Sequence, residues 1–123
     1  MNNEETAINE GYAEAFGYKK TQLMTPNGKP YADVYTHPDG NGVDHDGYCP
    51  NFAYSIDVIT KEIERRGLMC GFAQRRLPLG DIIRIIETEA AVWKDTDEHQ
   101  ALRETIPLAL CDALKEYIEN EET

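Results

Sequence analysis

The segment from His37 to Cys49 gathers the side chains best suited to ligate a metal ion: His37, Asp39, Asp44, His45, Asp46 and Cys49. A calcium-binding EF-hand loop needs oxygen ligands at alternating positions and a glutamate at its twelfth residue. Counted from Asp39 the twelfth residue is Pro50, and counted from Asp44 it is Ser55. The calcium pattern is therefore absent. Because Asp, Asn and Gly also form ordinary surface turns, we expect a solvated loop with no metal and no cofactor.

Cysteine catalysis would need a histidine close to the thiol in space. Cys70 and Cys111 fall in segments predicted to be buried, where a thiol usually fills space rather than reacts. Cys49 and His45 form the only pairing within a loop, and two residues of a turn do not define a catalytic site. Three widely spaced cysteines also argue against a disulfide framework or a closed zinc site. We therefore expect no catalytic residue and a non-enzymatic protein.

Arginines gather in a short basic segment, residues 61–84, which carries six basic and three acidic side chains. Arg65 and Arg66 end a predicted helix, and Arg75 and Arg76 end a predicted strand. If the chain direction brings these ends together, the four guanidinium groups would suit a phosphate or nucleotide ligand. Alternatively, they complement the helix dipole and pair with surface carboxylates, which is the interpretation we prefer.

Acidic side chains dominate the sequence as a whole, with 23 Asp and Glu against 12 Lys and Arg, for a net charge of −11. Such a field repels phosphate backbones and anionic lipids, so direct nucleic-acid or membrane binding is disfavoured. A charge run is commonly a solvated face, but a dense carboxylate surface can also imitate nucleic acid. The carboxylates that we expect to contact a partner are Glu87, Glu89, Asp95, Asp97, Glu98, Asp112, Glu116 and Glu119.

Three helices are predicted from apolar spacing and capping signals. In the first, Ile8, Tyr12 and Phe16 recur at every fourth position and are expected to face the core. In the second, Ser55 can cap the start and Gly67 can end the helix in a left-handed conformation. The predicted helices span residues 3–18, 55–66 and 104–118, and the last has Pro107 in its first turn.

Strands are predicted from β-branched composition and turn signals. We expect a hairpin over residues 19–36, and a buried strand over residues 68–74 that the Leu77-Pro78-Leu79-Gly80 run breaks. Residues 82–93 fit a helix by spacing, but their isoleucine-rich start favours a strand. A turn at residues 94–97 then leads into a strand that reaches Ala101. The sequence thus predicts an α+β fold, an α/β sandwich with a mainly antiparallel sheet packed by about three helices, as a single domain over residues 1–123.

Three blocks resemble the phage ABA sandwich domain family: Ile8-Asn9-Glu10 with Ala13-Glu14 and Gly17-Tyr18, then residues 50–56, then residues 105–114. The resemblance implies a small phage or prophage protein with an α/β sandwich, in a family mostly without assigned function. The blocks consist of helix caps and core residues. They therefore carry no site residue over to this chain.

Charge and resemblance together predict an acidic accessory protein that inhibits a host nucleic-acid-handling or defence system, in a counter-defence role of the anti-CRISPR type. Its expected partner is a host protein with a cationic groove, and its expected location is the host cytoplasm. The alternative is a protein that binds or sequesters a nucleotide or phosphate through Arg65, Arg66, Arg75 and Arg76.

Overall fold

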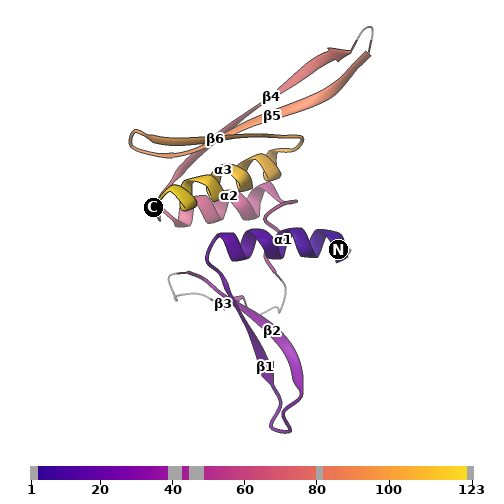
Figure 1. Cartoon of the computed structure of the whole chain (residues 1–123), viewed down its shortest axis with the longest axis vertical. Coiled ribbons are helices and arrows are strands. Elements are labelled where there is room, and N and C mark those ends of the chain that lie inside the picture. The colour runs from indigo at the N-terminus through magenta and orange to yellow at the C-terminus, as the bar shows by residue number, and fades with distance from the viewer. Residues whose placement is uncertain (1–2, 39–42, 45–48, 80–81, 122–123) are drawn as a thin grey trace. The chain divides into compact units, whose positions relative to one another are not determined.

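A computed structural model describes residues 3–38, 43–44, 49–79 and 82–121 of the chain (Figure 1). The chain forms two compact units, Met1–Pro50 and Asn51–Thr123, and each is described by itself. The single domain expected from length therefore stays a prediction. The predicted α+β class is confirmed, because three helices accompany two antiparallel sheets.

The first unit consists of a helix and a hairpin, as predicted. Helix α1 is followed by an antiparallel sheet in the order β1-β2-β3. Gly17 has a φ of 87°, and the amide of Tyr18 donates to the carbonyl of Ala13 at 2.9 Å, so a left-handed glycine ends the helix as expected. The elements are α1 (Asn3–Ala15), β1 (Lys19–Met24), β2 (Pro30–Thr36) and β3 (Val43–Asp44).

The predicted core stripe of α1 is partly wrong. Ile8 is 37% exposed, whereas Asn9, Ala13 and Phe16 are buried. Successive residues of an α-helix are about 100° apart, so the row that contains residues 8, 12 and 16 lies beside the row that contains residues 9 and 13. The small side chain of Ala13 lies on the row that is buried, so the packed side is shifted by one residue from the predicted row.

The second unit packs helices on a sheet in the order β4-β5-β6, with antiparallel neighbours. Helix α3 lies along β5 and β6, and α2 lies beside α3 (Figure 1). The strand predicted over residues 82–93 is confirmed, and the turn into β6 places Asp95 at a φ of 56°. The elements are α2 (Ile56–Arg65), β4 (Met69–Leu79), β5 (Ile82–Lys94), β6 (Asp97–Arg103) and α3 (Ile106–Glu121).

Helix α2 begins and ends at the predicted signals. The Ser55 hydroxyl accepts from the amide of Val58 at 3.4 Å. Gly67 has a φ of 75°, and the amide of Leu68 donates to the carbonyl of Ile63 at 3.1 Å. This is a Schellman cap, and the burial of both Ile63 and Leu68 fits the apolar contact that accompanies it.

The predicted break over residues 77–80 is wrong at Leu77, Pro78 and Leu79, because β4 continues through Pro78 to Leu79, and Gly80 lies outside the described residues. The register between β4 and β5 shifts between Leu77 and Pro78. A proline lacks an amide donor, and sheets tolerate it at edge strands and bulges. Here both conditions apply, since β4 is an edge strand in the sheet order.

Side chains of the β4–β6 sheet alternate between two faces. On β5, Thr88, Ala90 and Val92 are fully buried, and these residues define the inner face. Their β6 partners include Arg103 and His99, whose side chains contact residues of α3. Helix α3 therefore covers the inner face along β5 and β6, whereas Phe72 of β4 stays 48% exposed on the same face. The intervening residues of each strand form the outer face.

Candidate functional site

The outer face of the β4–β6 sheet carries both apolar and charged side chains that are exposed. Among the residues whose side chains are described, the register places the side chains of this face in four rows across the strands. These rows are Met69–Trp93–Glu98, Gly71–Ala91–Gln100, Ala73–Glu89–Leu102 and Arg75–Glu87. Gly71, Ala73 and Ala91 are the small residues among these larger side chains.

Large apolar side chains on this face remain in contact with solvent. Met69 is 61% exposed and Leu102 is 56% exposed. The ring of Trp93 lies across Gly71, where an added Cβ would be 3.4 Å from Cη2 of the tryptophan. Apolar side chains gathered on one exposed face are typical of surfaces that bind other molecules.

Carboxylates alternate with these apolar groups. Arg75 Nη2 lies 2.9 Å from Glu87 Oε1 and 3.8 Å from Glu89 Oε2. The first contact is a hydrogen-bonded ion pair, whereas the second exceeds hydrogen-bond length. The Glu89 side chain is 42% exposed, so its carboxylate can accept further donors.

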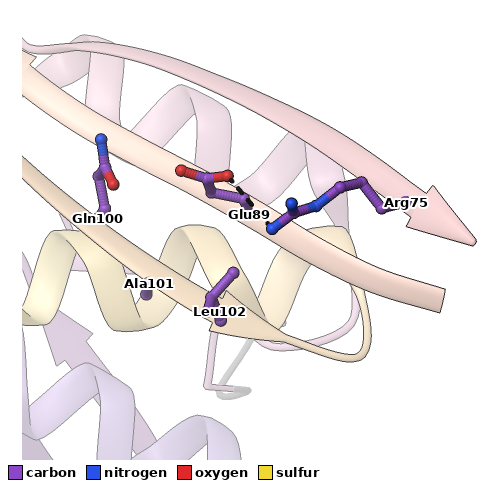
Figure 2. Close-up of a pocket in the computed structure, with 5 residues that line it drawn as sticks. All are labelled: Arg75, Glu89, Gln100, Ala101 and Leu102. Carbon is purple, nitrogen blue, oxygen red and sulfur yellow. Dashed lines mark ion pairs between the residues drawn. The ribbon is translucent and has the colours of Figure 1, made fainter. Parts of the chain in front are cut away.

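A shallow hollow of about 390 Å³ opens beside Glu89. It is lined by Arg75, Glu89, Gln100, Ala101 and Leu102 (Figure 2). The hollow thus combines a guanidinium, a carboxylate, an amide and aliphatic side chains, and Arg75 forms a long ion pair with Glu89 within it. The carboxylate and the amide can accept from the head of a second long cationic side chain, and the aliphatic groups can cover its stem.

The predicted acidic face is divided between two regions. Glu87, Glu89 and Glu98 lie on the outer face of the sheet. Asp97, Asp112 and Glu116 instead lie near the seam between β6 and α3, where they surround His99 and Arg103. The two remaining predicted residues are Asp95, in the turn before β6, and Glu119, which is 4.0 Å from Lys115 on α3.

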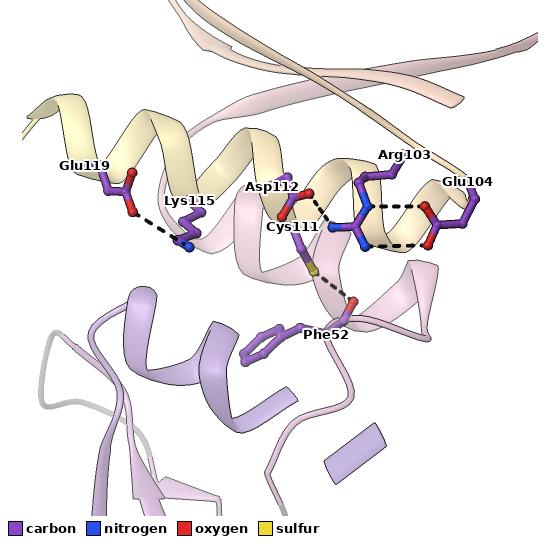
Figure 3. A network of polar contacts seen from close by, with 7 residues as sticks. All are labelled: Phe52, Arg103, Glu104, Cys111, Asp112, Lys115 and Glu119. Atoms are coloured by element: carbon purple, nitrogen blue, oxygen red, sulfur yellow. Dashed lines mark hydrogen bonds and ion pairs between the residues drawn. The ribbon is translucent and has the colours of Figure 1, made fainter. Parts of the chain in front are cut away.

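The β6–α3 seam is already paired in charge. Arg103 Nη1 donates to Asp112 Oδ2 at 2.6 Å, and Arg103 Nε donates to Glu104 Oε2 at 3.3 Å (Figure 3). The hydrogen bond from Arg103 lowers the pKa of the Glu104 carboxyl. His99 Nε2 lies 3.0 Å from Asp97 Oδ1, and the imidazole stands edge-on to the ring of Tyr117. These contacts hold α3 on the sheet, so we interpret the β6–α3 seam as a structural contact and not as a binding site.

The predicted arginine cluster does not form. Arg65 Nη2 and Arg66 Nε donate to Glu62 Oε1 at 2.7 and 2.8 Å. Arg75 lies six residues into the strand that starts at Met69, about 20 Å along it, and pairs with Glu87. Arg76 is exposed and belongs to the opposite face of β4. Three of the four guanidinium groups therefore pair with carboxylates, as the preferred interpretation expected.

One cysteine, Cys111, fills space in the core as predicted, whereas Cys70, also expected to be buried, is partly exposed, and so is Cys49. Cys111 is buried, and its thiol donates to the carbonyl of Phe52 at 3.1 Å (Figure 3). Burial raises the pKa of the Cys111 thiol well above its ordinary value, and burial also raises the pKa of Cys70. A raised pKa keeps a thiol protonated and unreactive.

The loop of potential metal ligands falls mostly outside the described residues, since residues 39–42 and 45–48 are not described. At its start, His37 Nδ1 lies 2.8 Å from the Tyr18 hydroxyl. Within the described ranges, no group of three metal-ligating side chains occurs. Of the helices described, none is long and apolar enough to cross a membrane.

A second hollow, of about 290 Å³, lies in the first unit between α1 and the hairpin. Lys20 lines it and approaches Glu10 at 3.9 Å and Asp33 at 3.5 Å. Burial raises the pKa of Tyr35, which also lines the hollow. Each of the two hollows thus holds a cation of the chain itself, and the outer face is the stronger candidate because it adds exposed Met69 and Leu102.

No family model, curated protein or solved structure matches this chain. The resemblance to the phage ABA sandwich family therefore remains a prediction, and the site must be judged from its own chemistry. The sequence pointed to Glu87, Glu89 and Glu98 but missed Met69, Trp93 and Leu102. Period-two spacing was the available signal, since Glu87, Glu89, Ala91 and Trp93 alternate with the buried residues of β5.

Proposed function

We propose that this protein is a non-enzymatic binding protein that docks on a partner protein with a cationic surface and inhibits it. The observation that supports the proposal is the outer face of the β4–β6 sheet, where exposed Glu89 and Glu98 lie among exposed Met69 and Leu102. Proteins that bind nucleic acid present cationic grooves, so they are the partner class that this face fits best.

Charge and apolar surface contribute to different rates in such a complex, charge to association and apolar contact to dissociation. The net charge of −11 attracts a cationic partner over a distance and raises the association rate. Desolvated apolar contacts then slow dissociation, since buried aromatic and aliphatic groups dominate interface energies. A surface with carboxylates alone would associate fast but bind weakly at physiological salt.

The counter-defence role and a phage origin belong to the same proposal, and they rest on the resemblance alone. Inhibition would follow from occupancy: a partner whose cationic groove holds this chain cannot hold nucleic acid in the same place. The host cytoplasm is where such a partner would be met.

The alternative ligand-binding role has less support, because Arg65, Arg66 and Arg75 already pair with carboxylates. A thermal-shift screen with nucleotides separates the two functions. A ligand-binding protein gains stability by mass action when the nucleotide is added, whereas the protein proposed here gains none.

Affinity capture tests the proposal. The tagged chain is incubated with nuclease-treated host lysate at low and at moderate salt, and the retained proteins are identified. A nucleic-acid-binding protein that is retained at low salt and weakened at moderate salt supports the proposal. Retention of no such protein, or of partners insensitive to salt, would contradict it.

A further inference from the structure

The geometry points to an arginine side chain of the partner as the occupant of the hollow beside Glu89, with neighbouring apolar residues of the same segment resting on Leu102 and Trp93. This inference rests on the proposed function and names the docking surface and the chemistry of its partner. The occupant is thus a polypeptide segment that alternates cationic and apolar side chains.

The hollow offers acceptors that fit a guanidinium. Glu89 contributes a 42% exposed carboxylate, and Gln100 contributes an exposed amide oxygen from the neighbouring strand (Figure 2). A planar guanidinium has five N–H donors and binds a carboxylate through two parallel hydrogen bonds. An ammonium has three donors around a point and keeps its water more firmly, so lysine should bind less well.

Arg75 does not block this arrangement. Its guanidinium is held by Glu87 at 2.9 Å and approaches Glu89 at only 3.8 Å. Glu87 therefore balances the charge of Arg75, while Glu89 keeps capacity for a second cation. Leu102 lines the same hollow and can cover the methylene stem of the entering side chain.

A second copy of this chain is a poorer occupant. The outer face carries Glu87, Glu89 and Glu98 against Arg75, so its net charge is −2 among the described residues. Two such faces repel each other when they are pressed together, whereas a cationic segment removes the repulsion. Charge complementarity therefore selects a cationic polypeptide over self-association.

The chain has a built-in reporter for this surface, because Trp93 is its only tryptophan. A short synthetic peptide of alternating arginine and leucine is titrated while Trp93 fluorescence is recorded. Two matched peptides replace arginine by lysine or by its neutral isostere citrulline. We expect saturable binding for the arginine peptide, weaker binding for the lysine peptide and no binding for the citrulline peptide.

Two variants separate a local site from the general field of the protein. Glu89→Gln removes a charge from the hollow, and Glu64→Gln removes the same charge from the exposed side of α2, outside the predicted acidic face. E89Q should weaken binding of the arginine peptide about tenfold, the usual size of a charged hydrogen bond, whereas E64Q should change it less than about twofold. Equal weakening by E89Q and E64Q, or binding of citrulline as tight as arginine, would overturn the inference.

The same two variants, used in the capture experiment, distinguish failure of the docking surface from failure of the proposed function. Loss of the retained partner with E89Q but not with E64Q supports both. A partner retained equally by both variants overturns the docking surface and leaves the function standing. Glu89-dependent peptide binding without any captured nucleic-acid-binding protein supports the surface chemistry and contradicts the function.

Discussion

Glu62 is a buried carboxylate that two arginines of the same helix end contact. It is 4% exposed and accepts hydrogen bonds from both Arg65 and Arg66 at the end of α2. Removing one member of a buried ion pair leaves the remaining charges poorly compensated. The two arginines are partly exposed, however, so water recovers part of that cost.

Replacement of Glu62 by glutamine should therefore lower the free energy of unfolding by about 2 kcal/mol, measured by urea denaturation. Glu64→Gln is the matched control, since Glu64 is exposed on the same helix and its loss should cost less than about 0.5 kcal/mol. Equal costs for the two variants would show that the Glu62 ion pairs contribute nothing beyond surface charge.

The Cys111 thiol predicts how stability depends on alkaline pH. Burial raises its pKa in the folded protein, while the unfolded thiol ionises near about 8.5. The unfolded state therefore releases a proton that the folded state keeps, so stability falls as pH rises above the unfolded pKa.

Between about pH 8 and about pH 9.5 this single group should cost about 1 kcal/mol of unfolding free energy. Cys111→Ala should remove that part of the decline, whereas Cys70, whose pKa is also raised, contributes its own part in both proteins. Urea denaturation of both proteins under reducing conditions, at the two pH values, measures this decline in unfolding free energy. A variant with the same decline as the wild type would refute the assignment.

Among the helices, two glycines differ in the backbone conformation that their positions require. Gly67 ends α2 with a φ of 75°, a conformation that L-residues with a side chain rarely adopt. Gly11 lies within α1, and an added Cβ would have no neighbour within 4 Å among the described residues.

Gly67→Ala should lower the free energy of unfolding by about 1 kcal/mol, and Gly11→Ala should raise it by about 0.5–1 kcal/mol. The two variants add the same methyl group, so each serves as the control for the other in thermal denaturation. Changes of the same sign in both would contradict the assigned helix boundaries.

Local signals explain which elements the sequence could predict. The start of α2 at Ser55 and its end at Gly67 depend on neighbouring residues alone, and both predictions are confirmed. The strand through Pro78 was missed because tolerance of a proline depends on whether its strand lies at a sheet edge, which is a tertiary property. The row of Ile8, Tyr12 and Phe16 was only partly correct for a similar reason: Phe16 is buried but Ile8 is 37% exposed, and the surface that packs on α1 decides which residues are buried.

The candidate site could be predicted only in part, for the same physical reason. Glu87 and Glu89 were found from charge alone, but their neighbours across the sheet depend on register. Register brings Leu102 beside Glu89 and Trp93 over Gly71. The predicted acidic face is divided between two regions because α3 packs on the inner face of the sheet. There Asp112 of α3 pairs with Arg103 of β6 and does not join the carboxylates of the outer face.

For the whole molecule, the central feature is an excess of negative charge combined with an exposed, partly apolar sheet face. The charge of −11 is spread along the sequence, with eight acidic and three basic residues in 1–50 and fifteen acidic and nine basic residues in 51–123. Long-range attraction therefore does not depend on one cluster. Specific contact with a partner does depend on one surface, and we place that surface on the outer face of the β4–β6 sheet.

Competition between this chain and a nucleic acid for the captured partner tests whether both occupy the same cationic groove. A labelled nucleic acid is bound to that partner, and this chain is added while fluorescence anisotropy is followed. We expect complete displacement of the labelled nucleic acid, because the two ligands share one groove. A ternary complex, in which the partner holds nucleic acid and this chain together, would contradict it.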